Sequence, residues 1–133
     1  MVQDRKKILF VCIENACRSQ MAEGFARKLA EGRVEVYSAG SKPSGVVNPT
    51  GIDVMRERGI DLTGQRSKGF KDLPVKEFDY VVTLGCGDVC PFVPGKERLD
   101  WQIPDPKGKP VEFFREVRDT IEREVGKLLE TIQ

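Results

Sequence analysis

The sequence predicts a small α/β domain of three layers, α/β/α, built on a four-stranded parallel sheet. Short apolar runs such as residues 7–12 and 78–84 are typical of strands that are buried on both faces of a parallel sheet. They alternate with longer stretches in which apolar residues recur every three or four positions, as in amphipathic helices. The chain has 133 residues, enough for one hydrophobic core, so we expect residues 1–133 to form a single domain.

Four strands are expected, at residues 7–12, 34–38, 78–84 and 98–102. The first is a continuous apolar run that stops at the polar residue Glu14. The second alternates between apolar and polar residues, and the third is rich in β-branched and aromatic residues. The proline-rich stretch after the fourth strand cannot continue a regular element.

Three helices are expected between and after these strands. The first, residues 17–31, has apolar residues at helical spacing and ends before Gly32. The second, residues 50–58, is short and ends at Gly59. The last, residues 110–132, carries one apolar stripe among charged residues, and we interpret this stripe as core packing.

The composition excludes several classes of function. With 39% hydrophobic and 32% charged residues the chain is expected to fold, and its net charge of +1 offers no field that would attract nucleic acid. The longest apolar run, residues 8–13, is far too short to cross a membrane or to act as a signal segment. We therefore expect a cytoplasmic monomer without a nucleic-acid or membrane partner.

The four cysteines indicate catalysis rather than a disulfide framework, because the expected compartment is reducing. Zinc binding is the alternative, but the cysteines are spaced C-x4-C and C-x3-C and the chain has no histidine. Structural zinc sites favour more closely spaced pairs, often with histidine. We therefore expect no metal site.

The segment between the first strand and the first helix has the pattern of an oxyanion-binding loop. Backbone N–H groups, a helix N-terminus and an arginine side chain can together surround an anion. The same positive field favours a thiolate at Cys12, and Ser19 can donate a hydrogen bond to its sulfur. Asn15 tolerates the left-handed backbone that such a loop needs. The expected loop consists of Cys12, Ile13, Glu14, Asn15, Ala16, Cys17 and Arg18.

Other candidate residues also follow predicted strands. Cys86 comes directly after the third strand, and Asp105 lies in the loop after the fourth. Ligands in parallel α/β sheets bind beyond the carboxyl ends of the strands. We therefore expect Cys86 and Asp105 to meet Cys12 at that edge.

Several motifs occur in the order typical of the low-molecular-weight protein tyrosine phosphatases. They are residues 18–24 (RSQMAEG), 37–40 (YSAG), 59–61 (GID), 81–84 (VVTL) and the late Asp-Pro pair. The chain resembles this family over nearly its whole length, and within it the thioredoxin-coupled arsenate reductases. The resemblance implies that Cys12 is the nucleophile, Arg18 the oxyanion clamp and Asp105 the general acid.

The remaining cysteines distinguish two activities within this family. A phosphatase needs one thiolate, whereas reduction of arsenate needs further thiols that release arsenite and form a disulfide. Residues 83–91 (TLGCGDVCP) resemble the redox segment of the reductases, which implies that Cys86 resolves the Cys12 adduct and Cys90 then pairs with Cys86. The resemblance also implies a structural role for Cys17. We expect no organic cofactor, and the resemblance leaves open a monovalent cation near Asn15, as in some relatives.

The sequence therefore favours an arsenate reductase that takes arsenate or a phosphate-like oxyanion and is regenerated by a thioredoxin-like reductant. The alternative is a phosphatase that hydrolyses phosphomonoesters through a phosphocysteine. Lys107 stands where the phosphatases commonly have tyrosine, which argues against a site for phenyl rings. Glu14 stands where the family usually has glycine, and an inward carboxylate would repel the anion. A third possibility is therefore an oxyanion- or partner-binding module without catalysis.

Overall fold

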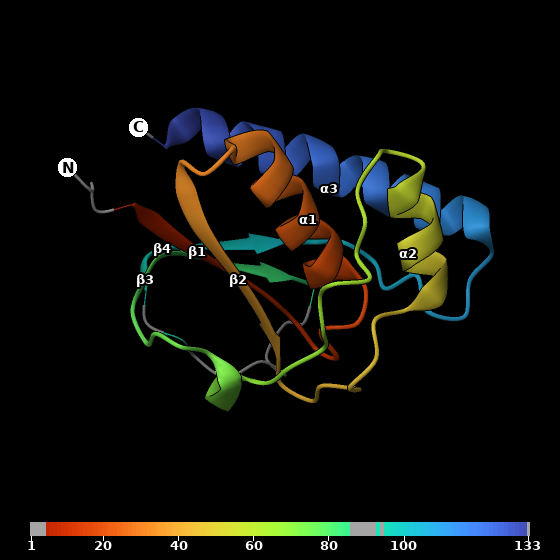
Figure 1. Cartoon of the computed structure of the whole chain (residues 1–133), viewed down its shortest axis with the longest axis horizontal. Coiled ribbons are helices and arrows are strands. Elements are labelled where there is room, and N and C mark those ends of the chain that lie inside the picture. The colour runs from red at the N-terminus through yellow and green to blue at the C-terminus, as the bar shows by residue number, and fades with distance from the viewer. Residues whose placement is uncertain (1–4, 86–92, 94, 133) are drawn as a thin grey trace.

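The protein, as a computed structural model, is described for residues 5–85, 93 and 95–132, and it consists of a parallel sheet flanked by helices (Figure 1). The order of elements is β1 (Lys6–Cys12), α1 (Arg18–Ala30), β2 (Val34–Gly40), α2 (Pro49–Arg56), the 3-10 helix η1 (Phe70–Asp72), β3 (Phe78–Leu84), β4 (Gly95–Trp101) and α3 (Val111–Thr131).

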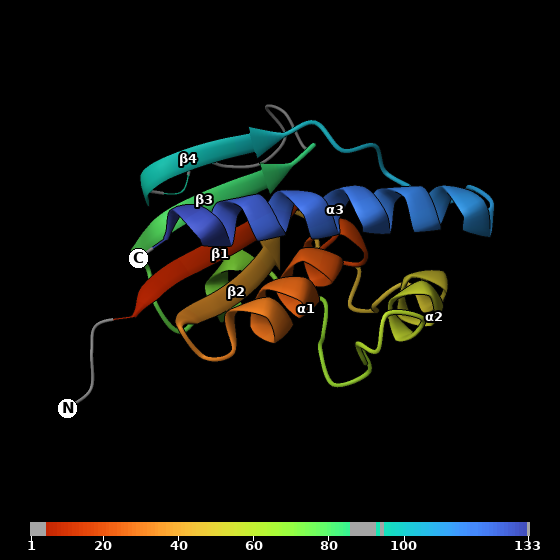
Figure 2. The same ribbon diagram turned by 90° about the horizontal axis from the view of Figure 1, so that it is seen from above.

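The sheet has the strand order β2-β1-β3-β4, and every neighbouring pair is parallel. This confirms the predicted α/β class with a four-stranded parallel sheet. Because the strands are parallel, their carboxyl ends lie at one edge, and α2 lies beyond that edge (Figures 1 and 2). The register pairs Cys12, at the end of β1, with Gly40, at the end of β2.

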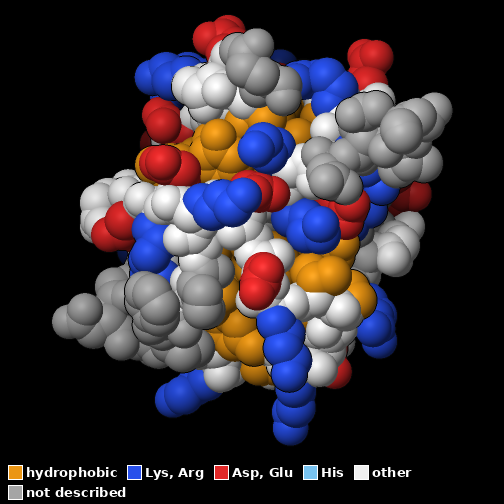
Figure 3. All heavy atoms as spheres, turned by 90° about the vertical axis from the view of Figure 1, so that its left-hand side faces the viewer, with side chains coloured by type: hydrophobic (Ala, Val, Ile, Leu, Met, Phe, Trp, Pro, Cys, Tyr) orange, Lys and Arg blue, Asp and Glu red, His pale blue; other side chains and the backbone are white. Residues whose placement is uncertain are grey.

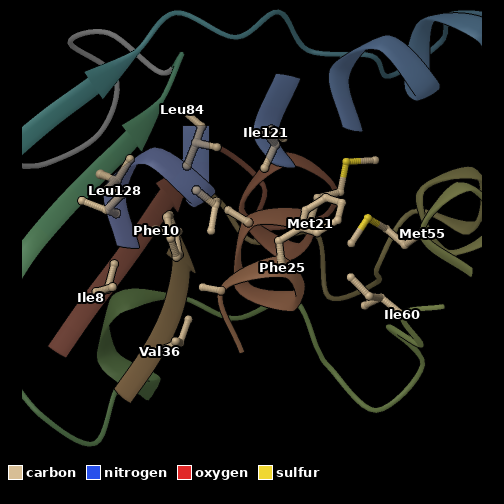
Figure 4. Close-up of a cluster of buried hydrophobic side chains, with 14 of the residues drawn as sticks. Ile8, Phe10, Met21, Phe25, Val36, Met55, Ile60, Leu84, Ile121 and Leu128 are labelled. Atoms are coloured by element: carbon tan, nitrogen blue, oxygen red, sulfur yellow. The ribbon is translucent and has the colours of Figure 1, made fainter. Parts of the chain in front are cut away.

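The two faces of the sheet are covered differently. Helices α1 and α3 pack on one face, where Ile8 and Phe10 of β1 enter the main core together with Met21 and Phe25 of α1 (Figure 4). The alternate residues of β1 face the other way, as the pleat of a strand requires. On that second face the described cover includes η1 and the segment after it, which gives the third layer.

The predicted elements agree closely with the structure. Each predicted helix differs from the observed one by one or two residues at either end. The strands differ more, since β4 begins at Gly95 and ends at Trp101, whereas residues 98–102 were expected. This edge strand is mostly exposed, so no continuous apolar run marks its start. The short helix η1 was not predicted.

An ion-pair network joins α2 to α3. The buried Arg118 donates to the backbone oxygen of Val54 at 3.0 Å and to the carboxylate of Glu57, just after α2, at 2.7 Å. Arg115 donates to the same carboxylate at 2.9 Å. Hydrogen bonds from Arg115 and then from Arg118 lower the pKa of Glu57 to about 2. The helix beside the carboxyl edge of the sheet is therefore fixed to the C-terminal helix.

The face at the amino ends of the strands carries charges of both signs, interspersed with small hydrophobic areas (Figure 3). Among the described residues, no helix is long and apolar enough to span a membrane.

Candidate active site

The predicted oxyanion loop connects the end of β1 to the start of α1. Cys12 is the last residue of β1, and Arg18 is the first residue of α1. Both are buried, with 3% and 4% of their surface exposed. Asn15, midway between them, has φ 51°, the left-handed conformation that the sequence predicted for it. The loop is thus fixed at both ends by regular structure.

A chain of hydrogen bonds lies beneath the loop and reaches Cys12, the predicted nucleophile. The Asn15 side-chain amide donates to Ser19 Oγ at 2.7 Å, and Ser19 Oγ lies 2.9 Å from Cys12 Sγ. The Asn15 amide nitrogen takes the first lone pair of this hydroxyl, which leaves the hydroxyl proton free for the sulfur. The side chain of Gln20 donates to Asn15 Oδ1 at 2.9 Å. The predicted contact between Ser19 and Cys12 is confirmed.

Gly40 gives the loop the space that it needs. A Cβ atom at this position would lie 2.6 Å from the backbone oxygen of Ile13 and 2.8 Å from the backbone nitrogen of Asn15. Only glycine allows β2 to approach the loop this closely. This is the physical reason for the glycine in the 37–40 motif.

The Arg18 guanidinium is held by the two neighbouring strand ends. Its Nη1 donates to the backbone oxygen of Leu84 at 2.6 Å and to that of Ile103 at 2.9 Å. Gly85 has φ 80°, and a Cβ there would lie 2.6 Å from Arg18 Nη1. Arg18 Nη2 lies 3.8 Å from the carboxylate of Asp105. Arg18 therefore joins the loop to the ends of β3 and β4, where the sequence predicted Cys12 and Asp105 to meet.

A buried acidic side chain lies under the same loop. Glu23 of α1, 4% exposed, accepts hydrogen bonds from Ser38 at 2.5 Å and from Arg27 at 2.6 Å. Lys68 Nζ donates to Ser38 Oγ at 3.0 Å and lies 3.7 Å from the Glu23 carboxylate. Burial lowers the pKa of Lys68, and Glu23 opposes this shift. The backbone N–H of Lys68 also donates to Asn15 Oδ1 at 2.9 Å.

These contacts bear on the monovalent cation considered near Asn15. The Oδ1 atom of Asn15 already accepts two hydrogen bonds, and Glu23 has a hydrogen-bond donor on each carboxylate oxygen. The Lys68 ammonium supplies positive charge at this place. The oxygen atoms that a bound cation would need are therefore engaged by protein donors, and these residues do not fit a free cation. Among the described residues, no group of three or more acidic or cysteine side chains is arranged to hold a metal.

Cys17 differs from Cys12 although both are buried. Burial, followed by the charges of Cys12 and Asp105, raises the pKa of the Cys17 thiol to about 12. A thiol with this pKa is protonated at neutral pH and is a poor nucleophile. The resemblance implied a structural role for Cys17, and this environment agrees with it.

The entrance of the loop is crossed by an ion pair between Glu14 and Lys107. The Lys107 ammonium lies 2.9 Å from one carboxylate oxygen of Glu14 and 3.2 Å from the other. Both side chains line, with Cys12, Arg18 and Asp105, a cavity of about 20 Å³. Glu14 therefore lies at the site with its charge paired, an arrangement that the sequence did not predict.

Larger pockets lie elsewhere, among them one beside Tyr80 and Trp101 with about 430 Å³ and one beside Arg5 and Tyr37 with about 440 Å³. Neither contains the predicted nucleophile or the oxyanion loop. We therefore place the active site at the small cavity over Cys12, because its lining residues have the required chemistry although its volume is small. Cys86 and Cys90, the predicted redox pair, lie outside the described residues.

The sequence pattern of the low molecular weight phosphotyrosine protein phosphatases matches residues 7–133. The chain belongs to this family. The loop from Cys12 to Arg18 and Asp105 all lie within the matched residues.

Several proteins similar to this chain are arsenate reductases. The "Glutaredoxin arsenate reductase" of Synechocystis is 43% identical over 130 residues, which cover 96% of this chain and 98% of that protein. A solved structure of "an arsenate reductase in the phosphate binding state" is 41% identical, with a TM-score of 0.87, over 96% of this chain and 99% of that one. A thioredoxin-dependent arsenate reductase of Corynebacterium glutamicum is 34% identical, with a TM-score of 0.82, over 100% of this chain and 64% of that one.

The sequence did not predict the residues that support the loop from outside it. Lys68 lies in an irregular segment far from the loop in sequence, and no motif marks it. The acidic residue Glu23 stands among the buried residues at the start of α1, which is the one local signal of a buried polar cluster. For Lys107, the partner of Glu14, the one signal in the sequence is its position two residues after the predicted general acid Asp105.

Proposed function

We propose that this protein reduces arsenate to arsenite by a relay of thiols in the cytoplasm. The observation that carries the proposal is the buried Cys12 sulfur, hydrogen-bonded to Ser19 at 2.9 Å at the start of a loop that ends in Arg18. This arrangement supplies a nucleophile and an anion site in a family whose similar members are arsenate reductases.

The first step is attack of the Cys12 thiolate on arsenic. Backbone N–H groups of the loop and the Arg18 guanidinium bind the arsenate oxygens, and Ser19 stabilises the thiolate. A sulfur–arsenic bond forms, and an arsenic–oxygen bond breaks. Asp105, whose carboxylate lies 3.8 Å from Arg18, gives the leaving oxygen its proton, so that water departs.

The second step transfers two electrons to arsenic. The Cys86 thiolate attacks the sulfur of Cys12, a disulfide forms, and the electron pair of the sulfur–arsenic bond leaves with arsenic as arsenite. Cys90 then attacks Cys86, which frees Cys12 and leaves a disulfide between Cys86 and Cys90. A Cβ atom at Gly85 would lie 2.6 Å from Arg18 Nη1, and Gly85 directly precedes Cys86 in the chain. This nearness to the loop supports Cys86 as the residue that reaches Cys12.

An external dithiol completes the cycle by reducing the disulfide of Cys86 and Cys90. We take this donor to be a thioredoxin-like protein, the kind named for the Corynebacterium glutamicum enzyme. The name of the Synechocystis enzyme indicates glutaredoxin instead. Arsenate turnover with each purified donor system separates the two.

No free cation is part of this proposal. The Lys68 ammonium, paired with Glu23 beneath the loop, serves as a tethered positive charge in its place. No organic cofactor is required, because the electrons come from thiols.

The variant Cys90→Ser tests the relay. It still contains Cys12 and Cys86, so each molecule should release one equivalent of arsenite and stop with these two cysteines joined. Arsenite is counted after rapid mixing of reduced protein with arsenate and thioredoxin, with the unaltered protein as the control that cycles. Sustained turnover by the variant would exclude the shuttle.

The alternative activity is phosphomonoester hydrolysis, which the family relationship supports. It needs Cys12, Arg18 and Asp105 but not the other thiols. Hydrolysis of an aryl phosphate that survives loss of both Cys86 and Cys90, together with absence of arsenite release, would make the protein a phosphatase.

A further inference from the structure

The ion pair at the loop entrance has a position that affects which anions can reach Cys12. Glu14 belongs to the oxyanion loop, and Lys107 belongs to the loop after β4. Contacts of 2.9 and 3.2 Å join the Lys107 ammonium to the Glu14 carboxylate. Among the described residues, these two, together with Arg18 and Asp105, are the charged side chains that line the cavity. The pair thus closes the rim from one loop to the other.

Lys107 is held in this position from its own loop as well. Its backbone N–H donates to the Asp105 carboxylate at 3.0 Å, and the same carboxylate lies 3.8 Å from Arg18. The hydrogen bond to Glu14 raises the pKa of Lys107, so the ammonium stays charged throughout the neutral range. The rim lysine and the general acid therefore occupy one short turn.

The space left beneath the pair is small. The cavity of about 20 Å³ holds little more than one water-sized sphere. An aryl group attached to a phosphate in the loop would have to extend outward past the rim, where Glu14 and Lys107 lie.

We propose that the pair of Glu14 and Lys107 is a specificity gate that favours inorganic oxyanions over phosphate esters. The inference rests on the proposed reductase function, for which a free tetrahedral anion is the substrate. The pair also cancels the negative charge that Glu14 would otherwise present to the anion. Because the side chains of Lys107 and Glu14 are 62% and 36% exposed, the closure is weak and opens readily for entry.

The test compares two anions that share the same charged head. Inorganic phosphate and phenylphosphonate are each titrated for protection of Cys12 from alkylation by iodoacetamide, mapped by peptide mass spectrometry. The readout is the ratio of the two protection constants. A change of charge at the rim acts on both anions alike and cancels in this ratio, whereas a change of access acts on phenylphosphonate alone.

The variants Glu14→Gln and Lys107→Met should each raise the relative binding of phenylphosphonate by roughly two- to fivefold, the size expected for an exposed pair. The exchanged pair, Glu14→Lys with Lys107→Glu, should return the ratio to that of the unaltered protein. In the control, Glu124→Gln with Lys127→Met removes an exposed pair of α3 with a separation of 3.7 Å, and the ratio should not change.

The unaltered protein offers a second measurement that needs no variant. Raising the salt concentration screens exposed pairs, so the relative binding of phenylphosphonate should rise with salt. A ratio that stays constant in both single variants and in salt would overturn the gate.

Failure of the gate is distinguishable from failure of the proposed function, because alkylation reports anion binding without reduction. A protein that reduces arsenate but shows a constant ratio contradicts the gate alone. A protein with the expected ratios that releases no arsenite contradicts the reductase function and leaves the gate intact.

Discussion

The floor and the rim of the oxyanion loop are built by opposite means. The floor consists of buried polar side chains: Asn15 and Ser19 are 0% exposed, and hydrogen bonds connect them to Cys12. The rim consists of one exposed ion pair, Glu14 with Lys107. Buried polar groups that lose a partner cost about 1–3 kcal/mol, whereas exposed ion pairs contribute about 0–1 kcal/mol. The floor therefore fixes the geometry around Cys12, the proposed nucleophile, whereas the rim can open and close.

The difference shows how one loop can be both rigid and accessible. The atoms that react need fixed positions, because a misplacement of about 1 Å can cost about a hundredfold in rate. The entrance needs to let arsenate in and arsenite out, and a weak exposed pair allows this. Changes to the floor should thus affect rate and stability strongly, and changes to the rim should affect selectivity mildly.

The largest effect on activity is expected from substitution of Cys12, the proposed nucleophile, to which the floor residues are hydrogen-bonded. Cys12→Ser should abolish both arsenate reduction and any hydrolysis of aryl phosphate, because an alcohol at this position is a far weaker nucleophile than a thiolate. Assays of arsenite release and of nitrophenol release check this. Turnover in either assay would show that another residue is the nucleophile.

A large effect on stability and turnover is also expected from a substitution in β2 that crowds the oxyanion loop. Gly40→Ala places a methyl group within 2.6 Å of the Ile13 oxygen, so the free energy of unfolding should fall by about 1–3 kcal/mol and arsenate turnover should fall with it. Urea denaturation measures the first quantity. The control is Gly126→Ala in α3, where the new methyl group would point into open space.

This control should instead raise the free energy of unfolding by about 0.5–1 kcal/mol, because alanine favours a helix over glycine. Equal effects of the two substitutions would contradict the close approach of β2 to the loop.

A smaller effect is expected from the Lys68 ammonium, the tethered positive charge beneath the loop. Arsenate reduction by the unaltered protein should be the same in sodium and potassium buffers. Lys68→Met leaves Glu23 without its ammonium, so turnover should fall and potassium should partly restore it. The matched variant Lys71→Met, at an exposed lysine of η1, should behave as the unaltered protein. Stimulation of the unaltered protein by potassium would contradict the role of Lys68.

The smallest effect is expected at the junction of α2 and α3, where an exposed acid contacts a buried arginine. The pKa of Glu57 is lowered to about 2 from its ordinary value of 4.5, first by Arg115 and then by Arg118. A lowered pKa of a carboxyl group stabilises the fold above the ordinary value, and this contribution is lost as the pH falls towards 2.

The variant Glu57→Gln should therefore be less stable than the unaltered protein at pH 7, and the difference should shrink between pH 5 and pH 2. Urea midpoints across this range measure it, with Glu130→Gln at an exposed position of α3 as control. A difference that does not depend on pH would show that the charge of Glu57 is unimportant.

The same contrast explains what could be predicted from the sequence. The floor residues near Cys12 follow local rules, since a left-handed asparagine and a serine on the first turn of a helix can be recognised from spacing. The strands and helices follow from apolar periodicity, apart from the exposed β4 and the short η1. The contact between Lys68 and Glu23 and that between Lys107 and Glu14 join segments far apart in the chain, and periodicity carries no information about them.

The proposed relay requires that arsenate cause a disulfide to form between Cys86 and Cys90. Fully reduced protein is mixed with arsenate, quenched with a thiol-blocking reagent, and mapped by peptide mass spectrometry beside a sample treated with phosphate. We expect a disulfide of Cys86 with Cys90 in the arsenate sample alone, with Cys12 and Cys17 free. Four free thiols after arsenate treatment would contradict it.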